Sequence, residues 1–137
     1  MLRTAIVAVL LVAAPVMAAE RTKAPKDVHL YIGWPNDGEV VKSPFKVWFG
    51  LRGMGVAPKD VRHADVGHHH LLIDTPLPPL DEPIPSDRNH LHFGNGETET
   101  MVTLPPGKHT LQLILGDHDH VPFDPPIMSK KITVTVR

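Results

Sequence analysis

Histidine is the residue type in this sequence with the clearest capacity for chemistry, and it is concentrated in three short groups. The sequence contains 10 histidines and no cysteine. The groups are His68-His69-His70, His90-Leu91-His92 and His118-Asp119-His120. Imidazole nitrogen binds zinc, copper and nickel well. Side chains two residues apart on an extended segment point to the same side, so each group could present two imidazoles together.

If the groups meet in the fold, they predict a shared metal site, from which three or four ligands would bind. The expected ligand pool is His68, His70, His92, His118 and His120, with His69, His90 and Met54 as weaker candidates. The absence of cysteine leaves no thiolate ligands, and copper or zinc is the expected metal. Copper is favoured because it binds most tightly among the common divalent ions, and because a thioether beside imidazoles adds to that preference.

Two other functions remain open from the residues alone. A His-ligated metalloenzyme would need an open coordination position and a nearby base, for which Glu97 and Asp119 are the candidates. A non-metal interaction domain would use its histidines as a pH-sensitive surface. The sequence contains no nucleophile elbow, phosphate loop or His-Glu-x-x-His motif. We therefore expect binding or delivery of a metal, and not catalysis.

The start of the chain has the pattern of a secretory signal peptide. A positive Met1-Leu2-Arg3 precedes an almost entirely apolar run from Ala5 to Ala19. The run is shorter than the roughly 20 residues that span a bilayer. The expected organisation is a cleaved signal peptide at 1–19, a flexible arm at 20–26 and one domain at 27–137. A periplasmic or otherwise exported protein is predicted, with a periplasmic partner protein as a further expectation.

Charge and cysteine content limit the remaining classes of protein. The 137 residues carry a net charge of −1 with scattered lysines and arginines, which predicts no binding to nucleic acid. No segment after the signal peptide is apolar enough to span a membrane. An exported domain without disulfides must be held together by its hydrophobic core.

The distribution of strand-forming residues predicts an all-β fold. Short runs rich in β-branched and aromatic residues alternate with turns rich in glycine and proline, and no segment has a sustained helical period. The expected architecture is an immunoglobulin-like antiparallel β-sandwich. The expected strands cover 28–32, 40–41, 45–51, 68–74, 89–93, 97–104, 109–115 and 132–136.

Two expected pairings would bring the histidine groups together. A hairpin of 97–104 with 109–115, turning at Pro105-Pro106-Gly107, would place His90 and His92 beside His118 and His120. An immunoglobulin-like order would pair 68–74 antiparallel with 109–115 and add His68 to His70 at the same end. His109 would lie at the opposite end, near Asp74, and is excluded from the site. Alternation along 68–74 turns His69 away from His68 and His70.

Several motifs resemble one exported bacterial family, the domain of unknown function number 4399. They are Gly-His-His-His-Leu-Leu-Ile-Asp at 67–74, His-Leu-His-Phe-Gly at 90–94, Leu-Pro-Pro-Gly-Lys-His-Thr-Leu-Gln-Leu at 104–113 and Asp-His-Asp-His-Val-Pro at 117–122. The resemblance implies an exported single domain and no particular activity. It marks His68, His69, His70, His92, His109 and His120 as motif residues. Glu97 stands where the family has glutamine. Because the resemblance marks His109 as a motif residue, it implies a structural role in which His109 bonds to the backbone or to Asp74.

Overall fold

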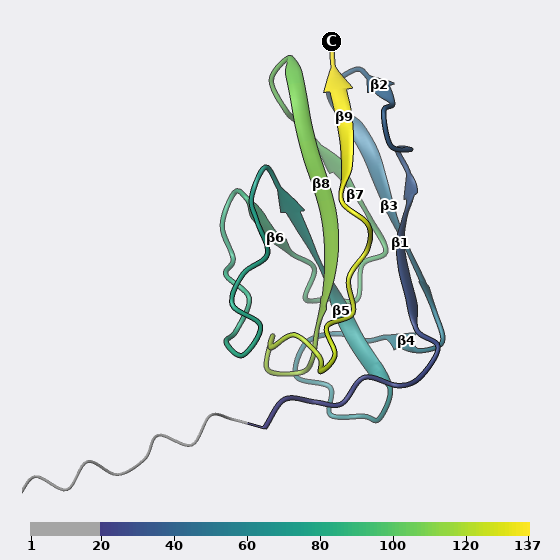
Figure 1. Cartoon of the computed structure of the whole chain (residues 1–137), viewed down its shortest axis with the longest axis vertical. Helices are drawn as coiled ribbons and strands as arrows, with labels where there is room; N and C mark the ends of the chain where they lie inside the picture. The colour runs from purple at the N-terminus through teal and green to yellow at the C-terminus, as the bar shows by residue number, and fades with distance from the viewer. Residues whose placement is uncertain (1–19) are drawn as a thin grey trace, which may run out of the picture.

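The computed structural model describes residues 20–137, which fold entirely from β-strands and connecting segments (Figure 1). The strands are β1 (His29–Trp34), β2 (Val40–Val41), β3 (Phe45–Arg52), β4 (Gly55–Val56), β5 (Val66–Ile73), β6 (His90–His92), β7 (Glu99–Val102), β8 (Gly107–Gly116) and β9 (Ile132–Val136). The expected signal peptide, residues 1–19, lies outside the described residues. Within the described part of the chain, no helix is long and apolar enough to cross a membrane.

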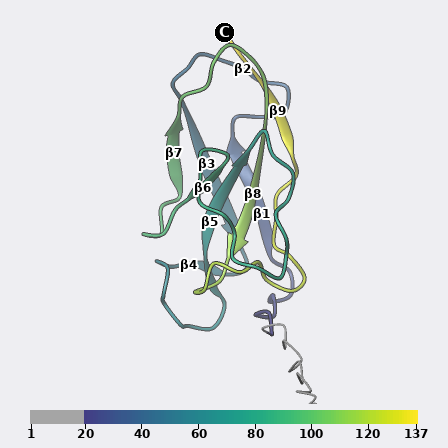
Figure 2. The same ribbon diagram turned by 90° about the vertical axis from the view of Figure 1, so that its left-hand side faces the viewer.

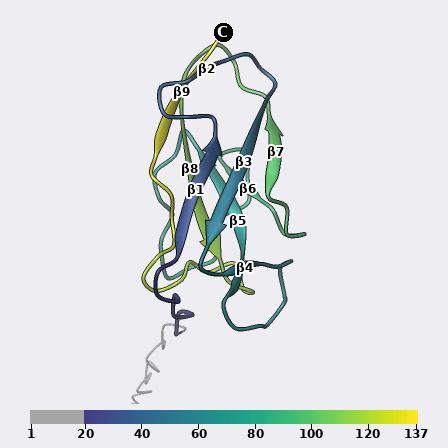
Figure 3. The same ribbon diagram turned by 90° about the vertical axis from the view of Figure 1, so that its right-hand side faces the viewer.

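The strands form two sheets. β1, β3 and β7 make a three-stranded sheet in the order β1-β3-β7. The larger sheet has six strands in the order β2-β9-β8-β5-β4, with β6 also paired to β5. Figures 2 and 3 show the two layers from opposite sides. Most neighbours are antiparallel, but β2 with β9 and β4 with β5 are parallel. The prediction of an all-β fold is confirmed.

The core lies between the sheets and follows from the two-residue period of the strands. Phe45, Val47 and Phe49 of β3 point inward and are buried, whereas Lys46 and Trp48 between them are exposed. Leu71 of β5 and Leu113 of β8 meet them from the other sheet and are fully buried. Burying such side chains stabilises the fold by about 1.5–3 kcal/mol each.

The expected hairpin of 97–104 with 109–115 is wrong. β7 pairs with β3, and β8 lies in the other sheet between β5 and β9. The connection between them contains Pro105 and Pro106, which have no N–H group to donate to a hairpin ladder. The chain therefore crosses between the sheets at this point. Since β7 does not run beside β8, the expected hairpin cannot be the reason that any histidines meet.

The second expected pairing is confirmed. β5 and β8 are antiparallel, with His68 opposite Gly116 and Ile73 opposite Leu111. The start of β5 therefore lies beside the end of β8 and the loop that follows it. This register places His68 and His70 next to the segment that carries His118 and His120.

The segment at 20–26, expected from the sequence to be a flexible arm, is bonded to the loop before β9. Lys23 forms an isolated parallel bridge with Asp124. The backbone N–H of Ala24 donates to the Asp124 carbonyl at 2.9 Å, and Arg21 donates to the carbonyls of Pro122 and Phe123. These bonds attach the start of the described chain to the segment after His120.

Candidate metal centre

The three consecutive histidines of β5 divide between the two faces of its sheet. His68, His69 and His70 are 1%, 0% and 0% exposed. His69 points into the core with Leu71, and its ring centroid lies 5.0 Å from that of Phe49. His68 and His70 point to the opposite face, where their Nε2 atoms are 3.0 Å apart. The predicted alternation along this strand is confirmed.

His92 and His120 complete a group of four rings on that face. His92 comes from β6, directly opposite His70 in the pairing of β6 with β5. Its ring centroid lies 5.0 Å from those of His68 and His70, and 4.8 Å from that of His120. His120 lies 5.0 Å from His68 and 6.3 Å from His70 by the same measure. We call His68, His70, His92 and His120 the histidine cluster.

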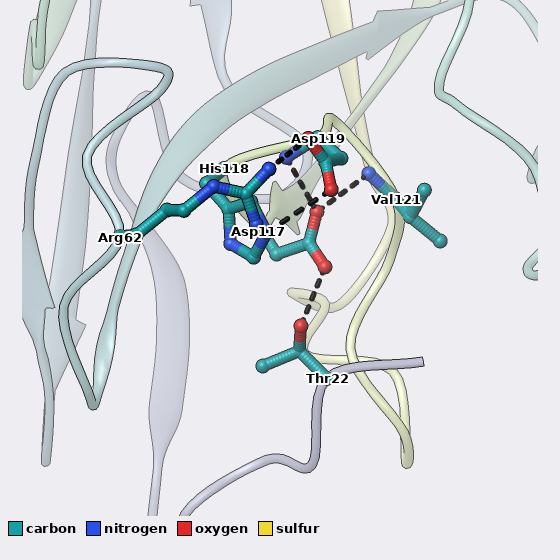
Figure 4. Close-up of polar contacts among 6 residues, drawn as sticks. All are labelled: Thr22, Arg62, Asp117, His118, Asp119 and Val121. Carbon is teal, nitrogen blue, oxygen red and sulfur yellow. Dashed lines mark hydrogen bonds and ion pairs between the residues drawn. The ribbon is translucent and has the colours of Figure 1, made fainter. Parts of the chain in front are cut away.

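The position of His120 depends on a loop that Asp117 holds in shape (Figure 4). The Asp117 carboxylate is buried and accepts hydrogen bonds from the backbone N–H groups of Asp119 and Val121, at 2.9 and 3.0 Å. Its second oxygen accepts from the Thr22 hydroxyl at 2.6 Å. The backbone of His120 is left-handed, with φ of 66°, and donates to the Asp117 carbonyl. Asp117 thus orders the loop, and Thr22 ties it to the N-terminal segment.

Gly116 and Gly94 have no side chain that would collide with the rings of the histidine cluster. A Cβ atom added to Gly116, which lies opposite His68 in β8, would stand 2.9 Å from Nε2 of His70. A Cβ atom added to Gly94 would stand 2.5 Å from Cε1 of His92. Since real Cβ atoms do not approach a ring so closely, any larger residue at these positions would displace a cluster side chain.

We therefore expect Gly116→Ala to weaken metal binding at least about tenfold, as loss of support around a ligand does. The added methyl group would push His70 and also approach the His120 Cα, at 3.4 Å. Gly55→Ala is the matched control, since the nearest atom to its added Cβ is the Val66 Cγ1 at 3.3 Å, outside the cluster. Chelator competition on both variants would measure the effect, and equal affinities would contradict the assignment of this space to the site.

The proline-rich segment 75–88 lies over the outer face of β5 beside the cluster, of which His92 and His120 remain partly exposed. Ile84 of that segment packs on Leu72 and Ile114, and all three side chains are buried. The backbone N–H of Ile84 donates to the His120 carbonyl at 2.8 Å. Both faces of β5 are therefore shielded from water. The sequence did not indicate this cover, because five prolines in the segment are equally compatible with a surface connection.

Burial keeps the imidazoles of His68 and His70 neutral. Desolvation, together with the charges of the neighbouring histidines, lowers the pKa of His68 to about 4 and that of His70 to about 2. Desolvation, with the charges of His120 and Lys59, also lowers the pKa of His92. A neutral imidazole has a free nitrogen lone pair, which is the form that binds a metal. At neutral pH the rings of His68 and His70 are therefore in the form that binds a metal.

The spacing of the nitrogens fits a transition metal. Bonds of about 2.0–2.1 Å at tetrahedral angles place neighbouring ligand nitrogens about 3.3–3.4 Å apart. One nitrogen from each of His68, His70 and His92 lies within 4.8 Å of the others, and the closest pair is 3.0 Å apart. Nδ1 of His70 and Nε2 of His92 are buried without a hydrogen-bond partner. A bound cation would engage Nε2 of His92, which otherwise lacks a partner.

Other residues of the expected ligand pool lie outside the histidine cluster. His118 contacts Arg62 and the Asp119 carboxylate on the surface side of its loop (Figure 4). His90 shares the face of His92 but bonds the Asp87 carboxylate at 2.9 Å. His69 points into the core. Met54 packs against the hydrophobic core. Each expected His-x-His pair outside β5 thus contributes one ring and not two.

His109 lies at the far end of β8, as expected, and has a structural role. Its Nδ1 contacts the Asp74 carboxylate at 2.6 Å and its Nε2 contacts the Pro105 carbonyl at 2.8 Å. Both partners are acceptors, so the doubly protonated ring satisfies both. The bond to Asp74 is the main reason that the pKa of His109 is raised. Asp74 is left-handed, with φ of 52°, and also accepts from the Thr110 N–H.

We expect His109→Gln to lower the free energy of unfolding by about 1 kcal/mol at pH about 6 without changing metal affinity. Because the folded pKa is raised, this contribution is complete below the unfolded pKa and is lost as pH rises through the folded pKa. The difference between wild type and variant should therefore shrink towards pH about 9. Denaturant unfolding at both pH values measures it, and an unchanged difference would contradict an ion-pair origin.

The geometry defines an all-β domain with a partly buried group of histidines on the outer face of one sheet. Residues 47–137 match the model of a protein family described as Domain of unknown function (DUF4399). The chain belongs to this family, as its motifs indicated, and the matched range contains the whole histidine cluster. No curated protein matches the chain, and no solved structure does.

Proposed function

We propose that this protein binds one transition-metal ion through His68, His70, His92 and His120, and that it carries or delivers the ion. The supporting observation is the convergence of these four imidazoles, with ring centroids 4.8 to 6.3 Å apart. They come from two strands and a loop, so the metal would tie together segments far apart in the sequence. A bound ion supplies positive charge and accepts electron pairs from the neutral rings.

Copper in its divalent form is the proposed ion, with zinc as the main competitor. Both suit imidazole, and divalent copper binds such ligands more tightly. Met54 packs against the hydrophobic core, so its thioether is not counted among the proposed ligands and adds nothing to this preference. The preference for copper therefore rests on the imidazoles alone.

Binding is favoured over catalysis because both candidate bases are engaged with other residues, although Glu97 is close enough to His92 for each charge to act on the pKa of the other. Glu97 bonds the backbone and side chain of Asn95. Asp119 is engaged with Arg62 and His118 on the surface. His68 and His70 are also buried, which restricts access of a substrate to these two rings. These contacts suit a site that holds its ion.

Export to the periplasm and an immunoglobulin-like topology complete the proposal. The first 19 residues have the composition of a signal peptide. The grouping of β1, β3 and β7 in one sheet, with β9, β8 and β5 in the other, supports the proposed immunoglobulin-like topology. A domain without cysteine suits a compartment where thiols would be oxidised.

The proposal is tested by elemental analysis of tag-free protein purified without chelators, followed by competitive titration with copper and zinc. We expect one equivalent of metal and nitrogen hyperfine structure in the paramagnetic resonance spectrum of the copper form. Several weak equivalents without nitrogen coupling would instead indicate adventitious surface binding and would overturn the proposal.

A further inference from the structure

The sandwich is open along one side, where a continuous groove separates β1 from the segment that leads into β9. Figures 1 and 3 show this segment, in yellow, running beside β1. One part of the groove, of about 490 Å³, lies between residues 24–30 and 125–128. The next part, of about 420 Å³, is lined by 29–32, Met128, Lys130 and Ile132. The two parts share His29, Leu30 and Met128 and so form one groove, and no residue of the histidine cluster lines it.

The β1 wall of the groove presents unpaired backbone groups. The N–H of Phe49 donates to the carbonyl of Thr98, so the backbone groups of Phe49 face β7 and not β1. Ile32 is the residue opposite Phe49, and its own N–H and C=O therefore point away from β3. By the same alternation, the N–H and C=O of Leu30 also point away from β3. Among the backbone hydrogen bonds of residues 20–137 outside the strand ladders, none involves either residue.

The opposite wall has a similar edge at Met128. The bonds from Leu115 N–H to the Ile127 carbonyl and from Ser129 N–H to the Leu113 carbonyl flank this residue. Met128 is bridged to Ile114, so its own backbone groups face away from β8. Its side chain is 41% exposed. The groove thus lies between two sheet edges that both offer main-chain donors and acceptors.

The side chains of the groove set the chemistry of an occupant. Its walls carry apolar Leu30, Ile32 and Ile132, which suit every second side chain of an extended strand. Lys26 and Lys130 are exposed at its rim, and in the described part of the chain neither lysine forms an ion pair. Asp27 is the acidic side chain among the lining residues. Acidic side chains on the occupant would complement this rim.

We propose that the groove binds an extended acidic segment of a partner polypeptide, which adds a strand to β1. Main-chain hydrogen bonds to Leu30 and Ile32 hold the segment, and Met128 contributes from the other side. Apolar side chains on one face of the segment enter the groove, while acidic ones on the other meet Lys26 and Lys130. This mode of recognition uses backbone pairing for affinity and side-chain pockets for selection. The inference is independent of the metal site.

The test uses the full isotope-labelled protein and two hexapeptides, one alternating valine with glutamate and one alternating valine with lysine. We expect the glutamate peptide to shift the amide resonances of Leu30, Ile32 and Met128 and to slow their hydrogen exchange. The lysine peptide should leave them unchanged. Ile32→Pro removes the groove-facing donor and should weaken binding at least about tenfold, whereas Ile32→Val keeps the donor and should change it less than about twofold.

A charge reversal keeps the test decisive if Ile32→Pro does not fold. Lys130→Glu should weaken binding of the glutamate peptide about threefold and should not affect stability, because Lys130 is exposed and unpaired. Unchanged amides at millimolar peptide, or equal binding of both peptides, would overturn the proposal. A concentration-dependent dimer that protects Leu30 and Ile32 without peptide would also overturn it, because the occupant would then be a second copy of this chain.

Discussion

His92→Ala is expected to lower the affinity for copper or zinc at least about 100-fold, since loss of a ligand costs more than the 10–100-fold of a lost supporting contact. His92 is the most accessible of the three rings whose nitrogens lie within 4.8 Å, so its truncation leaves the smallest cavity. Chelator competition at pH about 7 would measure the change. The folded state should remain intact, because β6 keeps its backbone pairing with β5.

His118→Ala is the matched control for this experiment. His118 belongs to a His-x-His pair and was an equally good candidate from the sequence, but its ring contacts Arg62 and Asp119 away from the cluster. We expect its replacement to change metal affinity less than about threefold. If the two variants lose affinity equally, the histidine cluster is not the binding site.

Acidification of the metal-free protein is expected to destabilise it between pH about 6.5 and about 4. Burial depresses the pKa values of His68 and His69 to about 4 and that of His70 further. As pH falls below about 6.5, the unfolded chain therefore takes up protons before the folded chain does, and stability is lost until the folded pKa is reached. For His69 alone the full loss is up to about 3 kcal/mol. Denaturant unfolding across this pH range measures it.

His69→Leu separates core burial from metal binding in the same experiment. Both ring nitrogens of His69 are buried without a hydrogen-bond partner, and the ring faces the core and not the cluster. The variant should resist acid better than wild type, because it has no buried imidazole to protonate at this position. Its metal affinity should be unchanged. Increased acid sensitivity in this variant would show that His69 has a partner that we have not identified.

Alternation along β5 was predictable from the sequence because an extended strand has a strict two-residue period. In the other two histidine groups, two-residue spacing does not bring both rings to the cluster. His118 and His120 lie in a turn with a left-handed residue at 120, so two-residue spacing does not place their rings together. His90 lies on the same face as His92, but Asp87 holds its ring. Local spacing could not reveal these contacts.

Pairing between distant strands was only partly predictable. The pairing of β5 with β8 follows from a general sandwich plan and was correct. His92 reaches the cluster through the short strand β6 beside β5. The sequence instead suggested that a hairpin of 97–104 with 109–115 would bring His92 there, and these segments do not pair. The space at Gly116 and the cover at Ile84 depend on neighbours far along the chain, and no local pattern marks them.

The composition of strand β5 (Val66–Ile73) also affects how the protein folds. Leu71, Leu72 and Ile73 are all apolar and all buried, so hydrophobicity alone barely distinguishes the native alignment of β5 from one shifted by a residue. Such a shift would exchange His69 with its two neighbours and remove both strand ligands from the cluster. A metal held by His68 and His70 would therefore select the correct alignment during folding, and supply of the ion at that moment would raise the yield of correctly assembled protein.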